Sequence, residues 1–297
     1  MNQLTDNPFY KAKLSGKPLI LDGAIGSLLQ QKGFETDDIL WTTNVNFNAP
    51  GEVIKIHRDY IAAGADIITT NTFRTNPYSL EQAGIFDIGK YVEAAVNLAK
   101  TAARGHNILI AGSNAPAEDC YKKERDISES ILSDNHCKHI DLLIDNGVDF
   151  ILNETQSHFD EIKIICNYCN SNNIPYVISL YLDENLDILS GEALLFVMSF
   201  IREHNPLAIG INCISIEQFK KVFDRINLDN FNWGFYLNCG AGKPTDKNIT
   251  CGVSPSYYAK IVSESLSYNP SFVGSCCGSS PGHIKAIRKV INESNSN

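Results

Sequence analysis

Three cysteines that follow apolar segments are the residues of this chain best suited to chemistry. Cys276 and Cys277 stand side by side, one residue beyond the apolar segment 271–274, and Cys213 follows the apolar segment 208–212. Zinc held by three protein ligands keeps its fourth position for a substrate. The pattern therefore predicts a sulfur-rich zinc site that acts on a sulfur nucleophile. Adjacent cysteines alone could be incidental or form a vicinal disulfide, but Cys213 at an equivalent position favours a metal.

The remaining cysteines show no comparable pattern. The chain has nine cysteines in 297 residues, and an odd number in a long chain argues against a disulfide framework. Cys166 and Cys169 have the spacing of half a zinc site, but they fall in a helical pattern without a second pair nearby. We therefore expect them to pack in the core as small apolar side chains. Cys239 and Cys251 flank the loop after the seventh apolar segment, and no role follows for them.

Eight short apolar segments recur along the chain and would position these residues. Each is apolar nearly throughout, which is typical of parallel strands covered by helices on both faces. Strand and helix repeated eight times predict a single (β/α)8 barrel domain over residues 1–297. An open, doubly wound sheet is the alternative, but no Gly-x-Gly-x-x-Gly motif follows the first segment. The predicted strands are 19–22, 66–70, 108–112, 150–154, 176–180, 208–212, 235–238 and 271–274.

Apolar stripes with helical spacing lie between the predicted strands. The stripe in residues 53–61 is followed by Gly64, which predicts a helix end there. A later stripe includes Ile131, which we expect to face the core. His136 and His139 fall in the polar part of the same helix, so we expect both side chains to be solvated.

Polar and metal-binding side chains gather at one rim when the predicted strands are aligned. In a (β/α)8 barrel the active site lies at the carboxyl ends of the strands. Two rim positions have plain structural alternatives, because Glu154 could begin a helix and Asp22 with Gly23 could form a turn. The rim residues are Asp22, Gly23, Thr72, Phe73, Glu154, Cys213, Cys276 and Cys277.

Composition and charge exclude several classes of partner. The formal net charge is −9, and no basic run or stripe is present, which argues against nucleic-acid binding. The longest apolar run, 193–198, is too short to span a bilayer. Residues 1–6 lack the basic and apolar regions of a signal peptide, so we expect a cytoplasmic protein that acts on small molecules. The asparagine-rich tail 292–297 is expected to fray.

Taken together, the rim motifs and their order resemble the homocysteine S-methyltransferases. That family includes the S-methylmethionine and betaine enzymes and the homocysteine module of cobalamin-dependent methionine synthase. The resemblance extends over most of the chain, from about residue 17 to residue 290. The segments that carry it are 21–27, 64–73, 153–155, 211–213 and 274–284.

The resemblance implies a zinc-dependent barrel in which Cys213, Cys276 and Cys277 bind Zn²⁺. Three thiolates leave one position for the homocysteine sulfur, and coordination to zinc deprotonates a thiol. A thiolate is the nucleophilic form of sulfur, so it would attack an activated methyl group and give methionine. Alignment of the two substrates would supply much of the remaining rate enhancement.

The resemblance also implies roles for the other rim residues. Glu154, counted with the cysteines as a catalytic group, would bind the amino group of homocysteine. Asp22 and Gly23 would line the pocket, and Thr72 and Phe73 would lie beside it. These roles are expectations that depend on the fold, because only the barrel brings such distant positions together.

The methyl donor is less well defined than the acceptor. The candidates are S-methylmethionine, S-adenosylmethionine, betaine, and a methylated corrinoid on a separate partner protein. Betaine needs an aromatic cage, whereas Arg74 follows Phe73, the one aromatic wall that the motifs provide. We therefore expect a small sulfonium donor, whose carboxylate Arg74 could bind.

Two further functions remain as alternatives. One is a non-catalytic zinc module or methyl-acceptor subunit, but the convergence of polar groups on one rim favours an enzyme. The other is a barrel lyase or hydrolase that uses zinc-bound water. Thiolates reduce the Lewis acidity of the metal, and water activation usually employs sites rich in histidine. The oligomeric state does not follow from the sequence.

Overall fold

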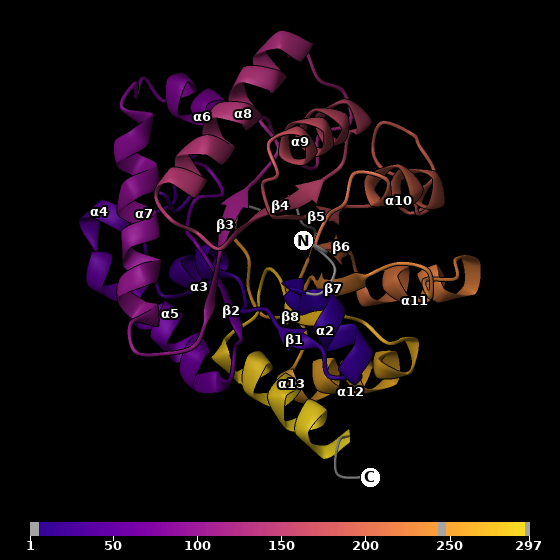
Figure 1. Ribbon diagram of the computed structural model, residues 1–297. Coiled ribbons are helices and arrows are strands. Elements are labelled where there is room, and N and C mark those ends of the chain that lie inside the picture. The colour runs from indigo at the N-terminus through magenta and orange to yellow at the C-terminus, as the bar shows by residue number, and fades with distance from the viewer. Residues whose placement is uncertain (1–5, 243–247, 295–297) are drawn as a thin grey trace.

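Eight parallel strands form the centre of the molecule, and helices surround them (Figure 1). The computed structural model describes residues 6–242 and 248–294. The strands pair in the order β1-β8-β7-β6-β5-β4-β3-β2, and Leu21 pairs with Ile67 where β1 approaches β2. The predicted (β/α)8 barrel is therefore confirmed. The strands are β1 (Leu19–Ile20), β2 (Ile67–Thr69), β3 (Leu109–Asn114), β4 (Phe150–Gln156), β5 (Tyr176–Leu180), β6 (Ala208–Asn212), β7 (Trp233–Leu237) and β8 (Phe272–Ser275).

The helices after β1 lie between and after the strands along the chain and cover the outside of the barrel, whereas α2 precedes β1. Side-chain caps begin several of them, and in α11 Ser215 and Gln218 form a reciprocal capping box. The helices are α2 (Pro8–Ser15), α3 (Ile25–Gln31), α4 (Val45–Asn48), α5 (Pro50–Ala63), α6 (Pro77–Gln82), α7 (Ile88–Ala103), α8 (Glu129–Asp145), α9 (Phe159–Ser171), α10 (Leu194–Arg202), α11 (Ile216–Arg225), α12 (Pro255–Ser265), the 3₁₀ turn η1 (Leu266–Tyr268) and α13 (Pro281–Ser294).

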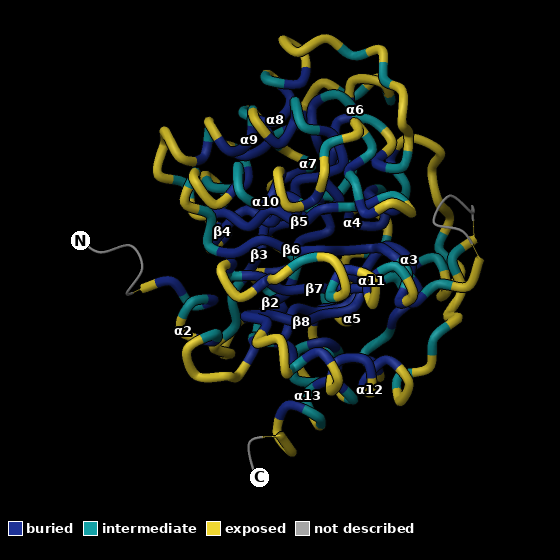
Figure 2. The backbone as a smooth tube through the Cα atoms, turned by 90° about the vertical axis from the view of Figure 1, so that its right-hand side faces the viewer, coloured by how far each residue is buried: buried dark blue, intermediate teal, exposed yellow. Residues whose placement is uncertain are grey.

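An aromatic side chain from the first described helix closes the amino-terminal end of the barrel. Phe9 of α2 packs edge-on against Phe150 and Phe272, the first residues of β4 and β8, at centroid distances of 5.4 and 5.5 Å. Figure 2 shows α2 at one end of the barrel and α3 at the other. The sequence patterns did not predict α2. Phe9 thus fills the interior of the barrel at this end, and a hollow of ≈ 1180 Å³ lies around α2 among the beginnings of the strands.

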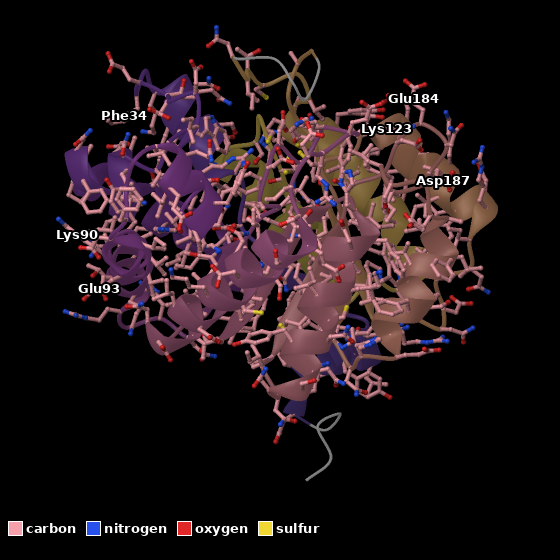
Figure 3. All side chains as sticks on the ribbon, turned by 90° about the horizontal axis from the view of Figure 1, so that it is seen from above. Phe34, Lys90, Glu93, Lys123, Glu184 and Asp187 are labelled. Atoms are coloured by element: carbon pink, nitrogen blue, oxygen red, sulfur yellow. The ribbon has the colours of Figure 1, made fainter. Side chains whose placement is uncertain are left out.

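The strands are buried, and the outer faces of the helices are exposed (Figure 2). On α7, for example, the charged side chains of Lys90 and Glu93 lie at the periphery of the molecule (Figure 3). Within residues 6–242 and 248–294, no helix is both long enough and apolar enough to cross a membrane.

The helix boundaries agree with the sequence in part. Helix α5 ends at Gly64, as predicted, and this residue has a φ of 106°. Ile131 does not face the core, because 46% of its surface is exposed. The helix α13 continues to Ser294, so residues 292–294 are helical and not frayed, and the rest of the predicted tail lies outside the described residues.

Candidate active site

A cavity of ≈ 480 Å³ opens at the carboxyl ends of the strands. It is lined by seven of the eight rim residues that the sequence singled out: Asp22, Gly23, Phe73, Glu154, Cys213, Cys276 and Cys277. Thr72 does not line it. That side chain is buried behind the wall, where its hydroxyl donates a hydrogen bond to the carbonyl of Ser113 at 2.8 Å.

The three cysteines of the cavity have the geometry of a metal site. The sulfur atoms of Cys213, Cys276 and Cys277 all lie within 4.8 Å of one another, and those of Cys213 and Cys277 are 3.8 Å apart. Ligands about 2.3 Å from a tetrahedral zinc are about 3.8 Å from each other, because the tetrahedral edge is about 1.6 times the bond length. The residues present therefore fit a tetrahedral ion with one position left for a further ligand.

The backbone at Cys213 is held in a conformation that such a residue rarely adopts. Cys213 has a φ of 56°, and Thr155 at the end of β4 has a φ of 59°. Asn212 joins these two strand ends, because its side-chain oxygen accepts from the Thr155 amide at 3.1 Å and its side-chain nitrogen donates to the Thr155 hydroxyl at 2.9 Å. Left-handed conformations of non-glycine residues cluster at functional sites. Here the conformation directs the sulfur of Cys213 toward the other two.

The vicinal cysteines are fixed by their own backbone. The amide of Cys276 donates to the carbonyl of Leu237 at 2.8 Å, and the carbonyl of Cys277 accepts from the amide of Cys239 at 2.8 Å. Gly278 follows with a φ of 80°, and a Cβ atom there would lie 2.5 Å from the backbone of Gly240. A side chain at position 278 would therefore force the cysteine loop away from the neighbouring strand end.

The three thiols also interact with one another. Hydrogen bonds from Cys276 and Cys277 lower the pKa of Cys213 well below its usual value, and a hydrogen bond from Tyr121 acts in the same direction. The hydroxyl of Tyr121 lies 3.2 Å from the sulfur of Cys213. The interaction with Cys213 correspondingly raises the pKa of Cys276 and of Cys277. These hydrogen bonds favour the thiolate form of Cys213.

Two carboxyl groups lie beside the cysteines, that of the buried Asp22 and that of the partly buried Glu154. Asp22 accepts hydrogen bonds from the amide and the hydroxyl of Thr69, at 2.9 and 2.8 Å, and Glu154 accepts one from the hydroxyl of Ser113. Burial raises the pKa of Asp22 to about 8 and the pKa of Glu154 to about 7. A cation bound in the cavity would favour the ionised form of both groups. The site is therefore suited to a ligand that has a positive charge close to a sulfur.

The predicted turn at Gly23 is a point of close packing. A Cβ atom there would lie 2.6 Å from the hydroxyl oxygen of Ser279 and 2.7 Å from that of Tyr60. Glycine is thus the residue that lets the β1 end approach the cysteine loop. The structural alternative for Glu154 is excluded, because β4 continues through it to Gln156 and α9 begins only at Phe159.

Aromatic residues of the cavity wall were missed by the sequence analysis. Trp41, Tyr121 and Tyr236 line the cavity together with Phe73, so the expectation that Phe73 is the one aromatic wall is wrong. Trp41 packs against Phe73 at a centroid distance of 6.1 Å. Tyr236 lies in the seventh predicted strand and could have been found from strand alternation, but Trp41 and Tyr121 lie in loops that have no periodic signal.

Arg74 also lines the cavity, where the sequence placed it. Its guanidinium lies 5.3 Å from the centroid of the Phe73 ring and donates to the carbonyl of Glu118 at 3.0 Å. Cys166 and Cys169 are buried in α9, as expected. Cys239 is buried, Cys251 is exposed, and neither lines the cavity.

The expectation for the two helix histidines is wrong, because His136 and His139 are completely buried. Asn114 at the end of β3 bonds to both rings, at 3.1 Å to Nδ1 of His136 and 2.9 Å to Nδ1 of His139. The other ring nitrogens reach Glu161 at 2.9 Å and Thr75 at 3.0 Å. Burial lowers the pKa of His139 to about 3. The prediction failed because the sequence neighbours of both histidines are polar, whereas the histidines belong to a buried hydrogen-bond network between α8, α9 and the barrel.

Comparison with known proteins agrees with this architecture. Residues 19–291 match the family model described as Homocysteine S-methyltransferase. Homocysteine S-methyltransferase 2 of Zea mays is 27% identical, over 94% of this chain and 91% of its own length. Homocysteine S-methyltransferase of Escherichia coli (strain K12) is 24% identical, over 91% of this chain and 94% of its own length.

A solved structure shares the fold at low sequence identity. The homocysteine methyltransferase MmuM from Escherichia coli, in its metallated form, superposes with a TM-score of 0.79 at 22% identity, and the match covers 95% of this chain and 99% of that one. The family model itself extends over nearly the entire barrel, from β1 into α13. This chain belongs to the homocysteine S-methyltransferase family.

Proposed function

We propose that this enzyme is a zinc-dependent methyltransferase that moves a methyl group from a sulfonium donor to the thiol of homocysteine, giving methionine. The observation that carries the proposal is the placement of three cysteine sulfur atoms and two carboxyl groups around one cavity. Homocysteine has both complementary groups, a thiol and an ammonium, on one small molecule. The names of the relatives and the metallated state of the Escherichia coli structure support the same function.

Cys213, Cys276 and Cys277 would hold the zinc ion. When bound, zinc would supply a Lewis acid that keeps a substrate thiol in its nucleophilic, deprotonated form. The chain's own contribution is a ligand set that is already assembled, since the sulfur separation of 3.8 Å matches a tetrahedral edge. Little reorganisation would then accompany metal binding.

Glu154 and Asp22 would bind the ammonium group of homocysteine. Desolvation raises the pKa of both carboxyl groups, so the ammonium charge would stabilise their ionised forms. The hydroxyl of Ser113 and the groups of Thr69 fix the carboxyl orientations. These contacts would orient the sulfur toward the cysteines and would exclude water from the ion pair.

The donor would occupy the outer part of the cavity. Trp41, Phe73 and Tyr121 offer aromatic faces to an onium methyl group, and Arg74 offers a guanidinium to the donor carboxylate. In the transfer, a new bond forms between the homocysteine sulfur and the methyl carbon. The bond between that carbon and the sulfonium sulfur breaks, and its electron pair remains on the departing thioether. No proton moves in this step, so no general base is required.

The direct test measures methionine formation by mass spectrometry. Zinc-loaded protein is given homocysteine with S-methylmethionine, S-adenosylmethionine or betaine, each at the same concentration. We expect turnover with at least one sulfonium donor and slower turnover with betaine. Faster turnover with betaine would overturn the donor assignment. Inactivity with all three would move the proposal to a methyl-acceptor subunit that works with a corrinoid protein.

A further inference from the structure

The loop between β3 and α8, residues 115–128, brings a tyrosine onto one of the three cysteines. The Tyr121 hydroxyl lies 3.2 Å from the sulfur of Cys213, and its ring packs edge-on against Tyr181 at a centroid distance of 5.0 Å. A metal-bound thiolate has no proton, so in the loaded site the hydroxyl would be the donor of this hydrogen bond. Tyr121 therefore contacts the proposed ligand set from outside it.

A single buried carboxylate of α9 holds this loop on both sides of Tyr121. One oxygen of Glu161 accepts from the amide of Ala117 at 2.9 Å, and the other pairs with Arg125 at 2.5 Å. Arg125 also reaches Asp160 at 2.5 Å, and its side chain is only 8% exposed. Glu161 is completely buried, and its pKa is lowered by its hydrogen bond to His136 and the charge of Arg125. The loop is thus tied to α9 by a charged, solvent-excluded anchor.

Three backbone carbonyls between the two anchor points are also held by side chains. Arg74 donates to the carbonyl of Glu118 at 3.0 Å, Ser157 to that of Cys120 at 3.0 Å, and His158 to that of Lys123 at 3.0 Å. The labelled side chain of Lys123, in contrast, lies at the periphery (Figure 3). A loop whose backbone is fixed at so many points has little freedom to move the Tyr121 hydroxyl away from Cys213.

We propose that Tyr121 is a positioning residue of the metal site, and that Glu161 acts through it by fixing the loop. The inference rests on the proposed metal site but not on the identity of the methyl donor or acceptor. Groups that hydrogen-bond to metal ligands orient those ligands, and their removal typically lowers metal affinity or activity by about 10- to 100-fold. The strained backbone of Cys213 makes such support important, because its φ of 56° must be stabilised by its surroundings.

The test compares Tyr121→Phe with Tyr181→Phe in the full-length protein. Both variants lose one hydroxyl from the same ring pair, but the Tyr181 hydroxyl makes no hydrogen bond to the three cysteines within the described residues. Zinc affinity is measured by competition with a chelator, and the cobalt-substituted protein reports the sulfur-to-metal charge-transfer band. We expect about 10-fold weaker zinc binding and a shifted band in Tyr121→Phe. Tyr181→Phe should match the wild type.

A double-mutant cycle separates positioning from general stability. If Glu161 acts through Tyr121, Glu161→Gln should weaken zinc binding in the wild-type background and should have little further effect when Tyr121 is already phenylalanine. If the losses of zinc affinity in the two single variants add in the double variant, Glu161 does not act through Tyr121, and the role proposed for Glu161 is overturned. If Glu161→Gln does not fold, the Tyr121 comparison still decides the proposal for the tyrosine.

The outcomes distinguish this inference from the proposed function. If the wild type binds zinc tightly and Tyr121→Phe has the same zinc affinity and the same cobalt spectrum, the positioning role of Tyr121 is overturned and the proposed metal site is not. Wild-type protein that fails to bind zinc or cobalt through its cysteines would overturn the proposed metal site and this inference with it.

Discussion

Replacement of Glu154 by glutamine removes a charge from the cavity and keeps the shape of the side chain. A hydrogen bond that involves a charged group contributes about 1.5–3 kcal/mol. At about 1.4 kcal/mol for each factor of ten, Glu154→Gln should weaken binding of a substrate ammonium by about 10- to 150-fold. Methionine is the best probe, because it has the ammonium group of the substrate but no thiol that could titrate or bind metal.

The raised pKa of Glu154 adds a second, sharper expectation. Desolvation raises its pKa to about 7, so below that pH binding of the ammonium must first displace a proton from the carboxyl group. Wild-type affinity for methionine should therefore increase as the pH rises from 6 toward 7, with proton release. In Glu154→Gln the number of protons released should fall by about one, while Asp22, with a pKa of about 8, keeps its own contribution.

Titration calorimetry in buffers of different ionisation enthalpy measures both the affinity and the number of protons released. Glu203→Gln, at an exposed position on the protein surface, is the matched control and should behave like the wild type. Zinc content should be unchanged in both variants. Equal methionine affinity and equal proton release in Glu154→Gln and the wild type would refute an ammonium-binding role for Glu154.

Three further outcomes test other parts of the site. Cys276→Ala should lose tightly bound zinc and methyl transfer while the barrel stays folded, whereas replacement of the exposed Cys251 by serine should lose neither, as elemental analysis and circular dichroism can show. Arg74→Ala should increase the concentration of sulfonium donor needed for half-maximal rate, with the KM for homocysteine much less affected. Burial raises the pKa of Asp22 from 3.8 to about 8, so the folded state binds this proton more tightly than the unfolded chain does. The contribution of this proton to the free energy of unfolding is fully present below about pH 4 and is lost as the pH rises through 8. Asp22→Asn should accordingly melt at a higher temperature than the wild type at pH 8.5, and the difference should disappear near pH 4.

The barrel and most of its rim could be predicted from the sequence for a physical reason. Strands covered on both faces must be apolar nearly throughout, so all eight were visible as short apolar segments. Once eight parallel strands are expected, their carboxyl ends must meet. That geometry alone brings Cys213 to Cys276 and Cys277, as the structure confirms.

The features that the sequence did not predict depend on contacts between distant segments. His136 and His139 lie among polar neighbours on α8. Nothing in the local sequence indicates that their ring nitrogens form hydrogen bonds with Asn114 and Glu161. Tyr121 belongs to an irregular loop, whose path is set by side chains of α9 and the loops before it. The spacing of apolar residues predicts which face of a helix or strand is buried, but it does not predict which polar side chain from another segment packs against that face.

The spacing of the three proposed metal ligands along the chain has a consequence for biosynthesis. Cys213 follows β6, while Cys276 and Cys277 follow β8, the strand that must pair with β1 to complete the barrel. During translation, a nascent chain that has not yet released β8 has one of the three sulfur ligands and an open sheet. If these cysteines bind zinc as proposed, stable binding requires synthesis of nearly all of the barrel, because a shorter nascent chain lacks two of the three ligands.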